Sequence, residues 1–145
     1  DRIAVWGWSG GGSMTLNLMF RYPEIYSTGM AVAAVSDLRY YDNIYQERYT
    51  GLPQENPEVY EEGSPINFAE NLEGNLLIVH GTADDNVHYQ NAEALIAELI
   101  KHGKQFDVMP YPNCSHGIYE IRGATKHIYT LLSNYLTEHV PAGGK

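Results

Sequence analysis

The chain lacks the features that mark several protein classes. Cys114 is the one cysteine among 145 residues, so neither an internal disulfide nor a zinc site built on several cysteines is possible. No apolar run approaches the roughly 20 residues of a membrane-spanning helix. Lysine and arginine together number 9 against 18 aspartates and glutamates, which argues against a surface for nucleic acid or anionic lipid. The protein class that these exclusions leave is a globular domain with an ordinary hydrophobic core.

A glycine-rich turn near the start is the most informative feature that is present. Residues 7–11 read Gly-Trp-Ser-Gly-Gly, between a strand-like segment, 2–6, and a helix-like segment, 13–20. A Gly-x-Ser-x-Gly turn between a strand and a helix is typical of the nucleophile elbow of α/β-hydrolases. We expect side chains at Gly7 and Gly11 to collide with neighbouring backbone, which is why such a turn favours glycine.

The elbow gives Ser9 a chemical role. It would hold the hydroxyl at a helix N-terminus, where free N–H groups favour a developing negative charge. Ser9 is therefore the candidate nucleophile, and the backbone N–H of Gly10 is a candidate oxyanion donor.

The rest of the chain alternates between strand-like and helix-like segments. This alternation predicts an α/β fold, with a mostly parallel sheet and helices on both faces. We find no repeats and no internal domain boundary, and the polar stretch 53–74 reads as a loop with short helical turns. Tyr41, Tyr45 and Tyr49 are spaced four apart, as on one face of a helix. The expected strands are 2–6, 28–35, 75–80 and 105–109, and the expected helices lie around 13–22, 92–99 and 128–136.

An elbow serine needs a base and an acid to orient it. In α/β-hydrolases these follow in the order serine, acid, histidine, from loops after later strands. The third expected strand leads to Asp84 and Asp85, and the fourth leads to His116. Of the 6 histidines, His116 alone lies on the loop after the last strand. We choose Asp84 as the acid, although spacing alone does not separate it from Asp85.

The sequence gives weaker support to two other kinds of site, a metal site and a cysteine nucleophile. A metal site could use a cluster of histidines and aspartates, but the cluster lacks the paired histidines of helical zinc sites. We expect neither a metal ion nor another cofactor. Cys114 is not at an elbow and is expected to be a buried thiol. The cluster considered for a metal comprises His80, Asp84, Asp85 and His88.

Three stretches together resemble the prolyl oligopeptidase family, in its dipeptidyl-peptidase branch. They are residues 7–9, 40–53 and 80–88, and the likeness extends over nearly the whole chain. The resemblance implies Asp84 rather than Asp85 as the acid, and implies that Asn86 binds the carbonyl of the residue before the scissile one. It also implies a pocket for a proline side chain, walled by Val35, Tyr41, Tyr45 and Val87, with Leu38 where relatives carry tryptophan.

Two further departures bear on specificity. Gly10 and Ser13 stand where relatives usually have tyrosine. The backbone donor at Gly10 is retained but a pocket wall is lost, so a roomier or reshaped pocket is expected.

The resemblance also bears on domains and partners. Residues 1–145 would be the C-terminal portion of a peptidase catalytic domain. The upstream half of that domain, a β-propeller, the glutamates that bind the substrate's amino group and a second oxyanion donor would lie outside this chain. Homodimers formed partly through the last strand and helix are implied as well.

The expected function is that of a serine peptidase acting through an acyl-enzyme. Its products would be N-terminal dipeptides with proline or alanine second. The same fold and chemistry allow a tripeptidyl peptidase, an acylaminoacyl peptidase or an esterase. A different class of function, an inactive segment serving as an assembly surface, also stays open. For the isolated 145 residues we expect little or no activity.

Overall fold

The computed structural model describes residues 3–140 and 142. Its strands form one parallel sheet in which sheet order follows chain order, β1-β2-β3-β4. The strands are β1 (Ala4–Trp8), β2 (Thr28–Val32), β3 (Asn75–Gly81) and β4 (Asp107–Tyr111). The helices are α1 (Gly10–Arg21), α2 (Asn43–Thr50), α3 (Pro57–Gly63), α4 (Gln90–Lys101) and α5 (Ala124–His139), with short 3-10 helices η1 (Leu38–Tyr40) and η2 (Pro65–Asn71).

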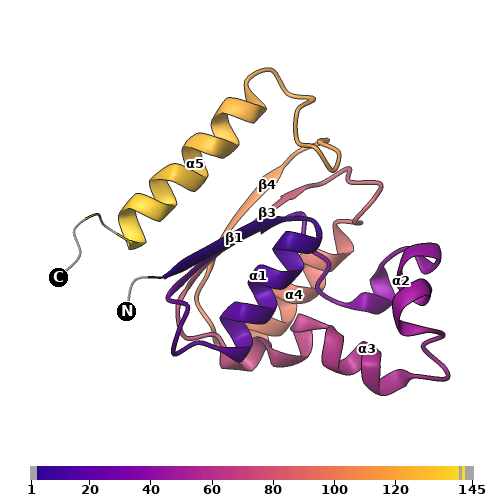
Figure 1. The fold of residues 1–145 in the computed structure, drawn as a ribbon. Helices are drawn as coiled ribbons and strands as arrows, with labels where there is room; N and C mark the ends of the chain where they lie inside the picture. Colours follow the sequence, from indigo (N-terminus) through magenta and orange to yellow (C-terminus); the bar gives the residue numbers. More distant parts are fainter. Residues whose placement is uncertain (1–2, 141, 143–145) are drawn as a thin grey trace.

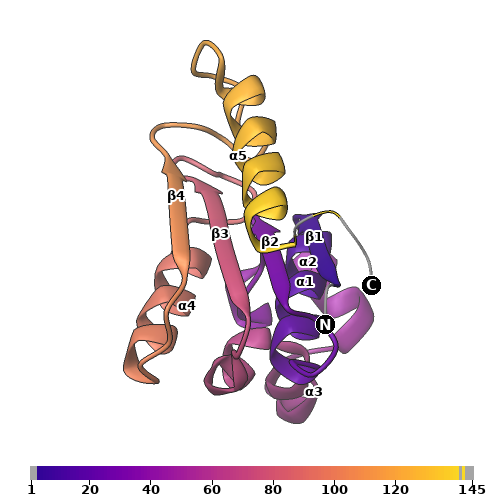
Figure 2. The same ribbon diagram turned by 90° about the vertical axis from the view of Figure 1, so that its left-hand side faces the viewer.

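Helices cover the sheet on both faces. Figures 1 and 2 show α5 on one face and α1 and α4 on the other. A core on the α1 and α4 side contains Phe20 and Leu95. A second core lies under α5 and includes Ile128. β2 is buried along its whole length, as an apolar strand covered on both faces should be. The predicted α/β architecture is confirmed.

Three predicted strands have different ends. β1 runs from Ala4 to Trp8, two residues later than the expected 2–6, and residue 2 lies outside the described residues. The apolar run 28–35 leaves the sheet after Val32, because Ala33 has a left-handed φ of 46°. The N–H of Ala33 still bonds to Val79 O of β3 at 2.8 Å. The fourth strand runs from Asp107 to Tyr111, two residues later than expected, in register with β3.

The tyrosine helix begins later than expected. Asp42 is the N-cap of α2 and its side chain accepts from Ile44 N, so Tyr41 precedes the helix and its placement on α2 is wrong. The three tyrosine rings nevertheless lie next to one another. The Tyr41 and Tyr45 rings lie 5.4 Å apart, and the Tyr45 and Tyr49 rings 5.2 Å apart.

Across residues 3–140, none of the helices is both long and apolar enough to span a membrane.

Candidate active site

The elbow holds Ser9 in an unusual backbone conformation. Its φ of 58° and ψ of −120° lie outside the helical region, and its N–H bonds to Val32 O at 2.8 Å. A Cβ at Gly7 would overlap the Gly11 backbone, as expected. The same expectation for Gly11 is wrong, because a Cβ there meets nothing within 4 Å. The second crowded position is Gly12, where a Cβ would lie 2.7 Å from Val32 O.

The N-terminus of α1 offers hydrogen-bond donors beside Ser9. The first N–H groups of a helix have no partner within it, and Gly10 is the first residue of α1. Ser9 is the N-cap but makes no side-chain cap hydrogen bond, so its hydroxyl is not committed to the helix. A Cβ added at Gly10 would face open space. The backbone N–H of Gly10 and the space beside it are therefore accessible to a substrate.

Asp84 is a buried carboxylate on the turn after β3. Its Oδ1 accepts from the backbone N–H groups of Asn86 and Val87, each at 2.9 Å. Its Oδ2 lies 2.7 Å from Nδ1 of His116. The side chain is therefore fixed from the backbone on one side and presented to the imidazole on the other. Asp85, its neighbour, is exposed.

A second histidine also contacts this carboxylate. The buried His80 Nε2 lies 2.8 Å from Val87 O and 3.3 Å from Asp84 Oδ2. Since a carbonyl oxygen only accepts, Nε2 carries the proton. Burial lowers the pKa of His80 below its usual 6.5, outweighing the opposing effects of the hydrogen bond to Val87 O and of the nearby Asp84. His80 thus makes a buried hydrogen bond to Val87 and lies against the carboxylate that also meets His116.

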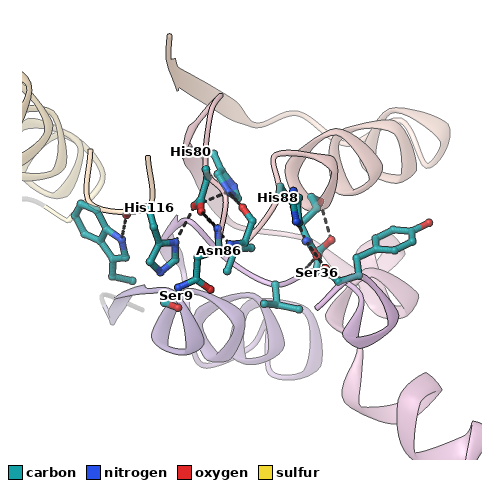
Figure 3. Close-up of polar contacts among 12 residues, drawn as sticks. Ser9, Ser36, His80, Asn86, His88 and His116 are labelled. Carbon is teal, nitrogen blue, oxygen red and sulfur yellow. Dashed lines mark hydrogen bonds and ion pairs between the residues drawn. The ribbon is translucent and has the colours of Figure 1, made fainter. Parts of the chain in front are cut away.

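His116 lies on the loop after β4. The left-handed residues that bend this loop are Asn113 and Ile118. The indole Nε1 of Trp8 donates to His116 O at 2.9 Å. Figure 3 shows His116 extending toward the start of α1, where Ser9 lies. Within residues 3–140, His116 is hydrogen-bonded to Asp84 but not to Ser9, and catalytic hydrogen bonds of this kind often tighten only when substrate binds.

A cavity of about 260 Å³ opens beside the candidate nucleophile. Four of the residues expected at the proline pocket line this cavity. Gln46, which the sequence did not single out, lines it as well. Asn86 and the fully buried Val87 are not among its lining residues. Those are Ser9, Gly10, Ser13, Val35, Leu38, Tyr41, Tyr45 and Gln46.

Hydrogen bonds hold two of the residues that line this cavity, Val35 and Tyr41, in place. Ser13 Oγ accepts from Val35 N at 2.9 Å, which ties the wall to α1. Tyr41 donates its hydroxyl to Asn86 Oδ1 at 3.0 Å. Burial, reinforced by the charge of Asp42, raises the pKa of Tyr41, so this tyrosine remains a phenol and a donor.

The alternative chemistries find little support in the geometry. In the part of the chain that the structure describes, no group of three or more His, Cys, Asp or Glu side chains could hold a metal ion. His80 and Asp84 contact each other, while His88 is exposed. The Cys114 thiol is free and fully buried, out of reach of a substrate.

Known proteins resemble this chain over most of its length. It is 47% identical over 139 residues to a "Probable dipeptidyl-aminopeptidase B" of Colletotrichum graminicola, covering 93% of this chain and 15% of that protein. A protein of the same description from Talaromyces stipitatus is 46% identical over 140 residues, covering 94% and 15%. The structure of dipeptidyl peptidase 4 from Porphyromonas gingivalis superposes with a TM-score of 0.92 at 40% identity, covering 94% of this chain and 19% of that one.

The chain thus spans a small part of its relatives, 15% of the length of the two fungal proteins. A sequence model described as "Prolyl oligopeptidase family" matches residues 1–142. With an elbow serine followed along the chain by a paired aspartate and histidine, the chain belongs to the prolyl oligopeptidase family.

Proposed function

We propose that this chain carries the catalytic residues of a serine peptidase that releases dipeptides from peptide N-termini, with proline or alanine second. The observation that carries the proposal is the 2.7 Å contact between Asp84 and His116, at the sheet edge where the elbow presents Ser9. Serine hydrolases with a catalytic triad use an aspartate, a histidine and a serine in this order along the proton-transfer path.

Each residue has a defined step in the reaction. His116 removes the proton from the Ser9 hydroxyl as its oxygen attacks the carbonyl carbon, and the Gly10 N–H stabilises the oxyanion. The same proton then passes from His116 to the departing amine, which leaves an ester on Ser9. Water, deprotonated by His116, releases the dipeptide and regenerates the serine. Asp84 holds the imidazole so that Nε2 faces Ser9.

The cavity supports proline or alanine as the second residue. Val35, Leu38 and the rings of Tyr41 and Tyr45 give walls suited to a small apolar ring. Asn86 accepts from Tyr41 with Oδ1, which leaves its amide NH₂ free to donate to the carbonyl of the residue before the scissile one.

The proposal extends to the polypeptide around this chain. Residues 1–145 act as the C-terminal portion of the catalytic domain, and segments outside it supply the second oxyanion donor and the carboxylates for the substrate's amino group. The chain matches 15% of the length of one fungal relative, which supports a longer polypeptide with further segments. We also propose homodimers through β4 and α5, where Val108, Tyr129 and Leu136 are exposed. Sedimentation of the full-length protein would test this: a monomer at micromolar concentration contradicts it.

A substrate panel tests the activity. The full-length protein is given Gly-Pro, Ala-Ala-Pro and acetyl-alanyl p-nitroanilides and a short-chain p-nitrophenyl ester, with Ser9→Ala as control. Cleavage of Gly-Pro by the wild type alone supports the proposal. Preference for Ala-Ala-Pro or acetyl-alanine identifies the tripeptidyl or acylaminoacyl activity instead. Turnover of the ester alone, or no Ser9-dependent reaction with a fluorophosphonate, overturns the peptidase.

A further inference from the structure

Asn91, in the first turn of α4, is fully buried and polar. Its Oδ1 accepts from the backbone N–H of Ser36 at 3.0 Å and of Asp37 at 3.4 Å. Its Nδ2 donates to Tyr40 O and to His88 O, both at 3.3 Å. Ser36 Oγ donates back to Asn91 O at 2.7 Å. This cluster lies around Ser36 and His88 in Figure 3.

The partners of Asn91 belong to the segment that forms much of the pocket wall. We call residues 35–41 the wall segment, because Val35, Leu38 and Tyr41 within it line the cavity beside Ser9. The segment lies beyond the end of β2 and contains only the short η1. Its backbone groups therefore have no ladder partners, and buried groups of this kind need other partners. Asn91 supplies one for three of them.

The same amide links the wall segment to the acid turn. Asn91 also binds His88 O, and His88 follows directly after the turn that carries Asp84 and Asn86. On the solvent side the hydroxyl of Tyr41 bonds to Asn86. Two ties, one buried and one exposed, therefore hold the wall segment against the loop that presents the catalytic acid. The carboxylate of Asp84 is fixed independently of Asn91, because its Oδ1 accepts from the backbone N–H groups of Asn86 and Val87.

We propose that Asn91 is a positioning residue that sets the selectivity of the pocket for proline. It acts on Leu38 and Tyr41 through the adjacent backbone groups of Asp37 and Tyr40, which it binds. It touches neither the substrate nor the reacting atoms. The inference rests on the proposed peptidase function. The rigid ring of proline binds more tightly when the wall segment is held at a fixed distance from it. The methyl group of alanine makes few contacts with the wall segment. Loosening the wall segment therefore costs a prolyl substrate more than an alanyl one.

The test measures selectivity in the full-length protein. Gly-Pro and Gly-Ala p-nitroanilides are compared in the wild type, in Asn91→Ala and in Asn91→Asp. For Asn91→Ala we expect KM for Gly-Pro to rise about tenfold, as loss of roughly one buried hydrogen bond implies. The alanyl KM and the rate at which a small fluorophosphonate labels Ser9 should change by less than about twofold. The ratio of kcat/KM for proline over alanine falls accordingly.

The aspartate variant guards against simple misfolding. Asn91→Asp keeps an acceptor for Ser36 and Asp37, and a carboxylate is favoured in the first turn of a helix. It loses the donor to both Tyr40 and His88, so an intermediate fall in selectivity is expected. Glu93→Ala, an exposed site on the same helix, serves as the matched control and should behave as wild type.

The possible failures are distinguishable. An unchanged ratio in both Asn91 variants, or an equal loss for both substrates together with slower labelling, makes Asn91 merely structural and overturns the inference. In either case a wild type that labels and cleaves leaves the peptidase proposal standing. A wild type that neither labels nor cleaves removes the proposed function and this inference together.

Discussion

The indole nitrogen of Trp8 donates a hydrogen bond to the carbonyl oxygen of His116 at 2.9 Å. Trp8 directly precedes the candidate nucleophile, and His116 is the candidate base. The bond therefore joins the two ends of the proton-transfer path across 108 positions of sequence. It fixes the loop of His116 relative to β1 without using either nitrogen of the imidazole ring.

Replacing Trp8 with phenylalanine keeps an aromatic ring but removes the donor. We expect kcat/KM to fall by about 5- to 30-fold, as the loss of one hydrogen bond of roughly 1–2 kcal/mol implies. The loss should appear in kcat and in the rate of fluorophosphonate labelling, with KM little changed. Labelling at the wild-type rate would show that the bond does not position the base.

The two adjacent aspartates provide a matched pair of variants. Asp84→Asn removes the carboxylate that meets His116 and should lower kcat by about 10⁴, the effect of the equivalent change in other serine triads. Asp85→Asn alters an exposed neighbour and should leave kcat within about twofold of wild type. Steady-state assays of both variants decide which aspartate is the acid, and a reversed order of effects would exclude Asp84.

Burial of His80 makes stability depend on pH. Its pKa in the folded chain lies below the 6.5 of an exposed histidine, so the unfolded chain binds a proton more readily. Stability is therefore fully present above about pH 6.5 and is lost as the pH falls toward the folded pKa, by at most about 1.4 kcal/mol per pH unit. Urea unfolding at pH 7.5 and 5.5 measures this. The difference should shrink in His80→Gln, and an equal difference in both proteins contradicts the assignment.

Gly7 and Gly10 should respond in opposite ways to the same added methyl group. At Gly7 a Cβ overlaps the Gly11 backbone, whereas at Gly10 it meets nothing within 4 Å. Gly7→Ala should lower the free energy of unfolding by more than about 2 kcal/mol. Gly10→Ala should raise it by up to about 1 kcal/mol, through reduced freedom of the unfolded chain. Chemical denaturation of both variants checks the pair, and equal losses would refute it.

Much of the fold could be predicted because its signals are local. Apolar runs mark β2 and β3, and turn residues follow β3 where the acid lies. The order of elements then places Ser9, Asp84 and His116 at one edge of the sheet. The separation of Asp84 from Asp85 came from the family resemblance, and the structure adds that only Asp84 meets His116.

What could not be predicted depends on distant contacts. Ala33 ends β2 while it bonds across to Val79, and no residue near it in sequence indicates a turn. Asn91 resembles any polar residue in the first turn of a helix until the wall segment is folded against it. Gly11 and Gly12 are adjacent and chemically identical, but only Gly12 faces β2 closely.

The strand order β1-β2-β3-β4 also governs how the protein folds. Every strand pair is parallel and needs a crossover connection, so the sheet is built from contacts distant in sequence, which slows folding. Ser9 follows the first of these strands and His116 the last. The site is complete only when β4 has docked and its loop has reached Trp8. In refolding experiments, recovery of fluorophosphonate labelling should therefore lag behind the recovery of helix, and would time the closing of the sheet.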